Sequence, residues 1–309
     1  MNTLQAPGAA VMIRPHHFRS NPETSSDNAF QTLSTPAAGD AARLALNEFD
    51  TAADQLRQAG VTVHVFDDTG TDTPDSVFPN NWFSTHAGGH VAIYPMFAEN
   101  RRRERRMDVI EMLKRDYRVQ DVIDYSGLEQ DGLALEGTGA MVLDHIARIA
   151  YTVQSNRADP VILERFCTHF NFEPVCFEAK DAQGRDVYHT NVLMGIGTDY
   201  ALAGLDMITD PARRATVARR LEESGREVIA LSHAQIGSFA GNAIELTGGR
   251  RILALSSTAL AALTPAQIAV IEKSAAPLPL SIPTIETAGG SVRCMIAGIH
   301  LSARERSQA

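Results

Sequence analysis

One structural unit recurs along the chain, and this repetition constrains the fold more than any other feature of the sequence. Each copy has an apolar segment, a turn, a second apolar segment, an amphipathic helix and a short closing apolar segment. The copies cover residues 10–70, 75–126, 133–178, 186–232 and 238–285, and a last apolar segment follows at 291–301. Because such a unit cannot bury its apolar face alone, neighbouring copies must pack against one another.

These units predict an α/β fold in which five ββαβ units form a ring, a five-bladed propeller with pseudo-fivefold symmetry. We expect the inner strands around a central axis and the helices outside. The segment 291–301 has no helix after it, so it is expected to pair with the first copy and close the ring. No linker rich in proline, glycine or serine divides the chain, and residues 1–309 are predicted to form a single domain.

Polar residues occur at one phase of the repeat, near the start of each opening segment, which we predict to be a strand. They are Asn81, Glu136, His189 with Asn191, Asn242 and Cys294. In a closed ring, equivalent positions converge on the axis. Buried polar groups cost free energy unless they find partners, so the set is predicted to form one shared site. The alternative for any single residue of this set is a polar side chain at a strand end that already has its hydrogen-bond partners.

The residue types in this set favour nucleophilic catalysis. A cysteine, a histidine and a carboxylate that orients the histidine allow a thiolate to attack while the histidine moves protons. Cys294 follows Gly289 and Gly290, which let the backbone approach a ligand closely. Cys167 and Cys176 lie beside phenylalanines and are interpreted as packing residues. Three cysteines do not form a disulfide framework, so we expect a reducing cytoplasm.

Other classes of protein are not favoured. No metal and no other cofactor is expected, since the Gly88-Gly89 turn separates His86 from His90 and no carboxylate or cysteine completes a ligand set. The net charge of −9 predicts no nucleic-acid partner, and the arginine-rich run 101–106 is interpreted as the solvated start of a helix. No apolar run reaches the roughly 20 residues of a membrane span, and no signal-peptide pattern opens the chain.

Six motifs resemble a known family. The segments Met-Ile-Arg-Pro (12–15), Phe-Pro-Asn-Asn-Trp-Phe (78–83), Leu-Glu-Gly-Thr-Gly (135–139), Tyr-His-Thr-Asn (188–191), Phe-Ala-Gly-Asn (239–242) and Ser-Val-Arg-Cys-Met (291–295) are similar to those of the citrulline-utilisation hydrolases. These belong to the guanidine-modifying, or pentein, superfamily with arginine deiminase and dimethylarginine dimethylaminohydrolase. The motifs occur in order over nearly the whole chain, and the resemblance implies the pentein fold, a five-bladed α/β propeller.

The resemblance also implies roles for individual residues. Cys294 matches the nucleophile, His189 the catalytic histidine, and Glu136 the glutamate that orients the histidine and touches the substrate. Arg157, in Ser-Asn-Arg (155–157), matches an arginine that holds the substrate α-carboxylate, for which bidentate recognition is suited. Its other interpretation is a surface ion pair. The remaining predicted substrate-binding residues are Phe78, Asn81, Asn191 and Asn242.

Two departures bear on the substrate. In arginine deiminase, aspartates that grip the cationic guanidinium stand at the positions of Asn81 and Asn191. Here both are neutral amides, which offer donors and acceptors to an uncharged ureido group but no counter-charge to a cation. The substitutions therefore favour citrulline over arginine, although Glu136 alone can still serve one guanidinium.

The leading hypothesis is hydrolysis of citrulline to ornithine, carbon dioxide and ammonia. Alternatives are an arginine deiminase or dimethylarginine dimethylaminohydrolase-like enzyme, an amidinotransferase, and a non-catalytic amino-acid-binding pentein. The expected partner is a small amino acid, and the sequence is compatible with a homo-oligomer. Residues 19–40 are polar and are interpreted as an entrance loop in which Asn21, Thr24 and Asn28 contact the substrate amine.

Overall fold

The computed structural model describes residues 4–32 and 38–304, which form five three-stranded sheets. In the first sheet, β1 (Ala9–Pro15) runs parallel to β2 (Thr62–Asp68), and α1 (Ala38–Gln58) connects them. The third strand of this sheet is β15 (Ala297–Gly298), which pairs antiparallel with β1. The end of the chain therefore completes the first sheet, as the sequence predicts.

The other four sheets share one topology, in which an antiparallel hairpin is followed by a helix and a third strand parallel to the second. The second unit contains β3 (Phe83–His86), β4 (His90–Ile93), α2 (Met107–Asp116) and β5 (Asp121–Asp124), and the third contains β6 (Met141–Asp144), β7 (Ile149–Val153), α4 (Pro160–Phe170) and β8 (Glu173–Phe177). The fourth contains β9 (Met194–Ile196), β10 (Tyr200–Ala203), α5 (Pro211–Glu223) and β11 (Glu227–Ala230), and the fifth contains β12 (Ile244–Thr247), β13 (Arg251–Ser256), α7 (Ser257–Ala262), α8 (Pro265–Glu272) and β14 (Ala276–Leu280). The short helix α6 (His233–Gly237) precedes the fifth unit, and α9 (Pro283–Glu286) follows it.

Local sequence signals explain where the outer helices begin. The helices α4, α5 and α8 each start on a proline, whose fixed φ suits the first helical position. The residue before each proline caps the helix, because the side chains of Asp159, Asp210 and Thr264 accept hydrogen bonds from backbone N–H groups of the first turn. These caps fix the point at which each crossover helix leaves its hairpin.

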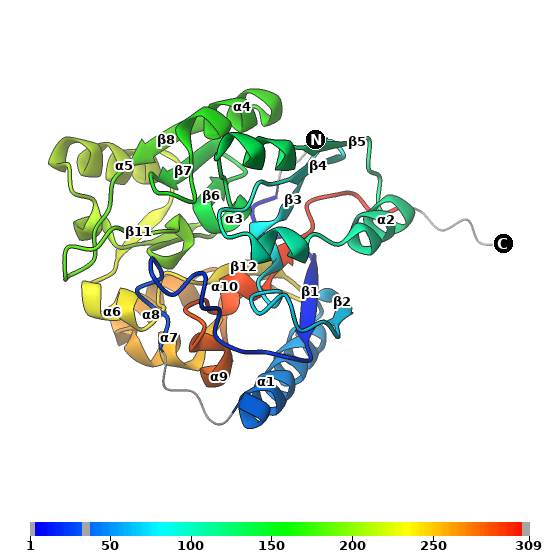
Figure 1. Ribbon diagram of the computed structural model, residues 1–309. Coiled ribbons are helices and arrows are strands. Elements are labelled where there is room, and N and C mark those ends of the chain that lie inside the picture. Colours follow the sequence, from blue (N-terminus) through cyan, green and yellow to red (C-terminus); the bar gives the residue numbers. More distant parts are fainter. Residues whose placement is uncertain (1–3, 33–37, 305–309) are drawn as a thin grey trace.

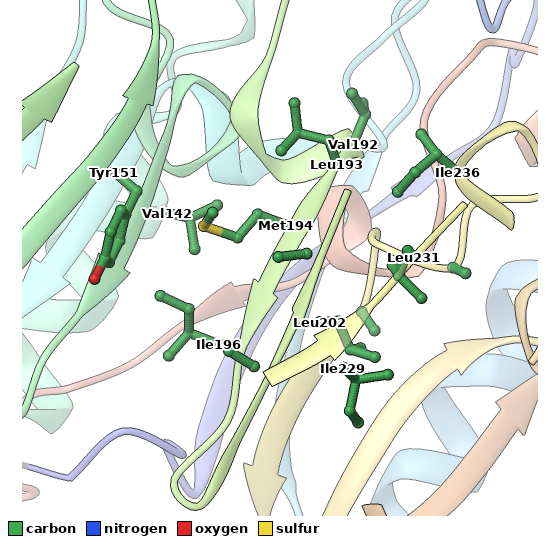
Figure 2. Packing of buried hydrophobic residues seen from close by; sticks show 14 of the residues in the cluster. Val142, Tyr151, Val192, Leu193, Met194, Ile196, Leu202, Ile229, Leu231 and Ile236 are labelled. Atoms are coloured by element: carbon green, nitrogen blue, oxygen red, sulfur yellow. The ribbon is translucent and has the colours of Figure 1, made fainter. Parts of the chain in front are cut away.

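The largest apolar cluster joins neighbouring units instead of lying within one of them. Figure 2 shows Val142 and Tyr151 of the third unit on one side of Met194, which belongs to the fourth unit, and Leu202 and Ile229 on its other side. All five side chains are buried. The core is therefore shared across unit boundaries, as expected for repeats that cannot bury their apolar faces alone.

The units follow one another around a common centre, with the long helices outside (Figure 1). The fifth unit meets the first where Thr247 donates its backbone N–H to Pro7 O at 3.0 Å and its hydroxyl to Ala6 O at 2.9 Å. Between the third and fourth units, the buried guanidinium of Arg226 pairs with Asp144 at 2.5 Å. Within the described part of the chain, every helix is too short or too polar to cross a lipid bilayer.

The opening segments differ from the prediction, because most do not begin as strands. Short helical turns precede the first strands of the hairpins: Pro79–Asn81, α3 (Gly137–Ala140) and Thr190–Val192, with α10 (Val292–Met295) before β15. The predicted polar residues therefore lie on or beside buried turns. A short buried apolar run has no periodicity that separates a turn from a strand, which is why the sequence misled here.

Candidate active site

The turns that open the units bring the predicted polar residues together at one small cavity. Its volume is about 20 Å³, and Phe78, Asn81, Arg157, His189 and Cys294 line it. Each of these five side chains is almost completely buried. The other three predicted residues, Glu136, Asn191 and Asn242, stand behind this lining and contact it directly. All eight predicted site residues are thus neighbours in the structure.

The sulfur of Cys294 faces two amide donors. Asn191 Nδ2 lies 3.2 Å from Sγ and Asn242 Nδ2 lies 3.3 Å from it. Asn242 is itself fixed, because its Nδ2 also donates to Asn191 O and its Oδ1 accepts from the backbone N–H of Arg293. Donors aimed at a sulfur stabilise negative charge on it, so the arrangement suits a sulfur that attacks as a nucleophile.

His189 lies against Glu136, with 2.9 Å between Nε2 and Oε2. The distance is that of a hydrogen bond, although the two groups are not aligned for one in this conformation. Burial lowers the pKa of His189, while the carboxylate of Glu136 opposes the shift by raising it. The ring is therefore held by an anion but is poised to be neutral.

Glu136 is completely buried and is surrounded by cations. Its Oε2 lies 3.5 Å from Arg101 Nη1 and 3.6 Å from Arg157 Nη1, in addition to His189. Burial alone would raise the pKa of Glu136, but Arg157, His189 and Arg101 together hold it well below its ordinary value. Glu136 therefore remains a carboxylate whose charge is already balanced within the protein.

Arg101 contradicts the interpretation of residues 101–106 as a solvated helix start. Its side chain is buried, and it forms a bidentate pair with Glu104 at 2.9 Å for both bonds. The segment Asn100–Glu104 is a 3-10 turn, and α2 begins only at Met107. A run of charged residues is exposed on average, but a single member of it can be buried. The prediction failed for Arg101 because buried carboxylates balance the charge of its guanidinium.

Arg101 also contacts Asn81. The amide of Asn81 is assigned with its oxygen toward the guanidinium, since the opposite orientation sets its nitrogen against donors. The oxygen then accepts from Arg101 Nη1 and Nη2 at 2.9 and 3.0 Å, and the nitrogen donates to Asn80 Oδ1 at 3.2 Å. Asn81 lines the cavity, but its oxygen already has a cationic partner.

Arg157 is paired within the protein. Its Nε donates to Asp27 Oδ2 at 2.8 Å, its Nη2 donates to Asp27 Oδ1, and its guanidinium lies over the ring of Tyr188 at 4.8 Å. Burial would raise the pKa of Asp27, but the bonds from Arg157 lower it below its ordinary value. The carboxylate of Asp27 thus occupies the bidentate face of Arg157 that the sequence assigned to a substrate carboxylate.

Sequence reasoning missed Asp27, Asp75 and Tyr188 as residues of this region. Asp75 lines the cavity, and one of its oxygens is buried without a hydrogen-bond partner. Asn21 Nδ2 donates to its other oxygen at 2.7 Å, so this member of the predicted entrance loop contacts Asp75 instead of the cavity, whereas Asn28 does line the cavity. The place of Asp75, just before the Phe-Pro-Asn-Asn motif, was the one available signal.

At two positions of the site, neighbouring side chains lie so close to the backbone that only glycine fits. A Cβ on Gly139 would lie 2.1 Å from the side chain of Asn81 and 2.8 Å from His189 Nδ1. A Cβ on Gly290 would lie 2.7 Å from the ring of Phe78. Phe78 therefore packs on the glycine loop that precedes Cys294, which explains its place in the cavity wall.

The chain matches one family model and several solved structures. The model describes N,N dimethylarginine dimethylhydrolase, eukaryotic, and matches residues 14–301. Comparison with curated protein sequences finds no match. A similar structure is the N-terminal domain of ArgZ, an arginine dihydrolase from the ornithine-ammonia cycle in cyanobacteria, in a substrate-bound mutant. Its TM-score is 0.73 at 15% identity, over 94% of this chain and 97% of that one.

Two further structures share the fold. A mutant of AgrE in binary complex with L-arginine has a TM-score of 0.72 at 15% identity, over 96% of this chain but 41% of AgrE. A dimethylarginine dimethylaminohydrolase mutant, as an adduct with S-methyl-L-thiocitrulline, has a TM-score of 0.64 at 13% identity, over 95% and 100% of the two chains. These likenesses confirm the pentein fold, and the match of the family model over 14–301 shows that the chain belongs to the N,N-dimethylarginine dimethylhydrolase family of hydrolases.

Proposed function

We propose that this protein is a thiol-dependent hydrolase that converts a citrulline-like amino acid to ornithine, carbon dioxide and ammonia. The observation that carries the proposal is the charge around the reacting sulfur. The groups that face Cys294 are the neutral amides of Asn191 and Asn242. Of the two carboxylates near the cavity, Glu136 is already matched by Arg101, Arg157 and His189, and Asp75 has Asn21 and Arg101 beside one of its oxygens. A neutral ureido group therefore fits this site better than another cation.

The proposed reaction has two steps, and it starts with His189 neutral, so that the ring takes the proton of Cys294 as the thiolate forms. The thiolate attacks the ureido carbon, and the bond from that carbon to the side-chain nitrogen of ornithine breaks as His189 protonates this nitrogen. A thiocarbamoyl group remains on the sulfur. His189 then takes a proton from water, which attacks this group and releases carbamate, and carbamate decomposes to carbon dioxide and ammonia. Glu136 holds the histidine ring throughout.

Asn191 supports recognition of the ureido group. Its Nδ2 is engaged by the sulfur, whereas its Oδ1 is buried without a partner. A buried acceptor without a donor costs free energy, which a ligand N–H group restores. The terminal amide of citrulline supplies such a donor next to the carbon that Cys294 attacks.

Binding of an amino acid requires the loop around Asp27 to move. The cavity at Cys294 is only about 20 Å³, whereas a polar hollow of about 480 Å³ is lined by residues 25–29 and Gln31. Asn28 and Tyr188 line both spaces. We infer that the substrate α-carboxylate replaces Asp27 on Arg157, and that its amine meets the unpartnered oxygen of Asp75.

Arginine is the second candidate substrate. Glu136 is a carboxylate beside the histidine, and a mutant of the similar AgrE is described in complex with L-arginine. A guanidinium at this site would add a cation to a cluster that already contains Arg101 and Arg157. The choice between the two substrates is therefore an electrostatic question that substitution can answer.

The first prediction concerns the nucleophile. Iodoacetamide should label Cys294 fastest, with peptide mass spectrometry over time as the measurement, because two donors stabilise its thiolate. Burial raises the pKa of Cys167 to about 12 and also raises the pKa of Cys176, so both should react slowly. Citrulline should protect Cys294 alone. Equal rates at the three cysteines would contradict the assignment.

The second prediction concerns the histidine. Glu136→Gln should lower the pKa of His189 further, because the carboxylate raises that pKa while burial lowers it. The protonated ring would then be lost at a more acidic pH than in the parent. Ring-nitrogen NMR titration in a Cys294→Ser background measures the shift. Glu223→Gln, on the exposed face of α5, is the matched control and should leave the pKa of His189 unchanged. A rise in the pKa would refute the proposed pairing.

The third prediction concerns substrate charge. In competition, the parent should have a higher kcat/KM for citrulline than for arginine. Asn191→Asp should move this ratio toward arginine by roughly 1–3 kcal/mol, since a neutral hydrogen bond becomes a charged one. Asn81→Asp should move it less, because Arg101 already faces that side chain and would neutralise the new charge.

Two results of this competition would change the assignment. A parent enzyme that prefers arginine makes the deiminase-like reaction the leading function. A larger shift from Asn81→Asp than from Asn191→Asp means that Arg101 does not shield position 81. Cys294→Ser should have no turnover with either substrate and serves as the blank.

The fourth prediction concerns Asp27. Asp27→Asn should lower KM by about 3–10-fold, because the substrate carboxylate no longer competes with a charged partner for Arg157. Steady-state kinetics with citrulline provides the measurement. Asp206→Asn is the matched control, since Asp206 is exposed, pairs with Arg214 and lies outside both the cavity and the polar hollow. An increase in KM would indicate that Asp27 binds the substrate amine instead.

A further inference from the structure

A second polar region lies behind the nucleophile. Arg293 precedes Cys294 on α10, which Figure 1 shows near the centre of the ring. Arg293 does not line the cavity of Cys294. It lines two separate small hollows, of about 30 and about 40 Å³, together with His145 and His300. Neither hollow has a part in the proposed reaction.

Arg293 is a cation that no carboxylate contacts directly among the described residues. Across residues 4–32 and 38–304, no carboxylate oxygen lies within 4.0 Å of its guanidinium nitrogens, and its one side-chain hydrogen bond runs from Nη1 to Ile296 O at 3.0 Å. The buried Arg101, Arg157 and Arg226 each pair with carboxylates. Burial lowers the pKa of Arg293 to about 10, and the neighbouring Cys294 opposes this shift.

The smaller hollow is lined by groups suited to an anion. Besides Arg293, it contains the rings of His145 and His300, which stack with centroids 3.8 Å apart. His145 is buried, and its Nδ1 has no hydrogen-bond partner among the described residues. Among those same residues, no aspartate or glutamate lines this hollow. The larger hollow, which shares Arg293, His145 and His300 with the smaller one, does include Glu245; its Oε2 accepts hydrogen bonds from Thr198, and its Oε1 is buried without a partner.

We propose that the smaller hollow binds a small monovalent inorganic anion of the size of chloride. Arg293 is partly buried, and a guanidinium removed from much of its water without a paired carboxylate is costly unless a counter-charge accompanies it. A volume of about 30 Å³ exceeds the roughly 10–15 Å³ that one water-sized particle needs. The anion accepts hydrogen bonds from Arg293 and from Nδ1–H of His145, and this tautomer satisfies the orphaned nitrogen.

The anion site is connected to the nucleophile through the backbone. The N–H of Arg293 donates to Asn242 Oδ1 at 3.1 Å, and Asn242 Nδ2 faces Cys294 Sγ at 3.3 Å. An anion that fixes the side chain of Arg293 therefore fixes α10 and the amide that faces the sulfur. Arg293 acts as a positioning residue, whichever substrate the thiol attacks.

Bromide provides a direct test with the unmodified protein. Crystals grown without chloride and soaked in sodium bromide should show an anomalous peak between Arg293 and His145. Peaks confined to the protein surface, with a water or an empty hollow at Arg293, would overturn the proposal. This readout is independent of catalysis, so it stands even where the proposed reaction fails.

Thermal unfolding tests the same site in solution. Replacing sodium gluconate by sodium chloride at constant ionic strength should raise Tm saturably, by about 2–4 °C. Arg293→Met should remove this increment, and His145→Phe should reduce it and serves where Arg293→Met does not fold. Arg219→Met removes an exposed arginine on α5 and should retain it. Equal chloride effects in the parent, His145→Phe and Arg219→Met would count against the site.

Discussion

The buried charge of Glu136 is the interaction on which the arrangement of the site depends. An unpaired carboxylate in the interior costs several kcal/mol, so its partners must be held in place by the fold. Arg101 comes from the second unit, Arg157 from the third and His189 from the start of the fourth. A single anion thus ties three units together, and the same contacts set the histidine beside the cysteine.

The repeat explains how side chains so far apart in sequence meet at one point. Most units open with a buried turn before the hairpin, and the ring directs these turns toward a common centre. Thr190 illustrates the cross-links between them, because its hydroxyl donates to Ala140 O and accepts from Val153 N–H at 2.7 Å. The repeat places equivalent positions around the ring, and the polar residues that interrupt the apolar pattern at these positions form the candidate site.

The fold and the central residues of the candidate site could be predicted from the sequence, but their electrostatic surroundings could not. Cys294, His189 and Glu136 could be predicted because each interrupts an apolar run at the same phase of the repeat. Arg101 and Asp27 could not be predicted, because they lie in a charge run and a polar loop, where such residues are ordinary. Whether they are buried and paired depends on tertiary contacts, which leave no local pattern.

The two ion pairs of Arg157 differ in how strongly solvent screens them. Its contact with Glu136 is fully buried and is strengthened by the low polarity of the interior, whereas Asp27 keeps 20% of its side-chain surface exposed. Solvent screens the outer pair more than the inner one. In the proposed binding mode, the outer contact is the one that exchanges with the substrate carboxylate, while the inner contact keeps the guanidinium in place. This difference between the two pairs is how the proposed binding mode reconciles a closed cavity of about 20 Å³ around the thiol with entry of an amino acid.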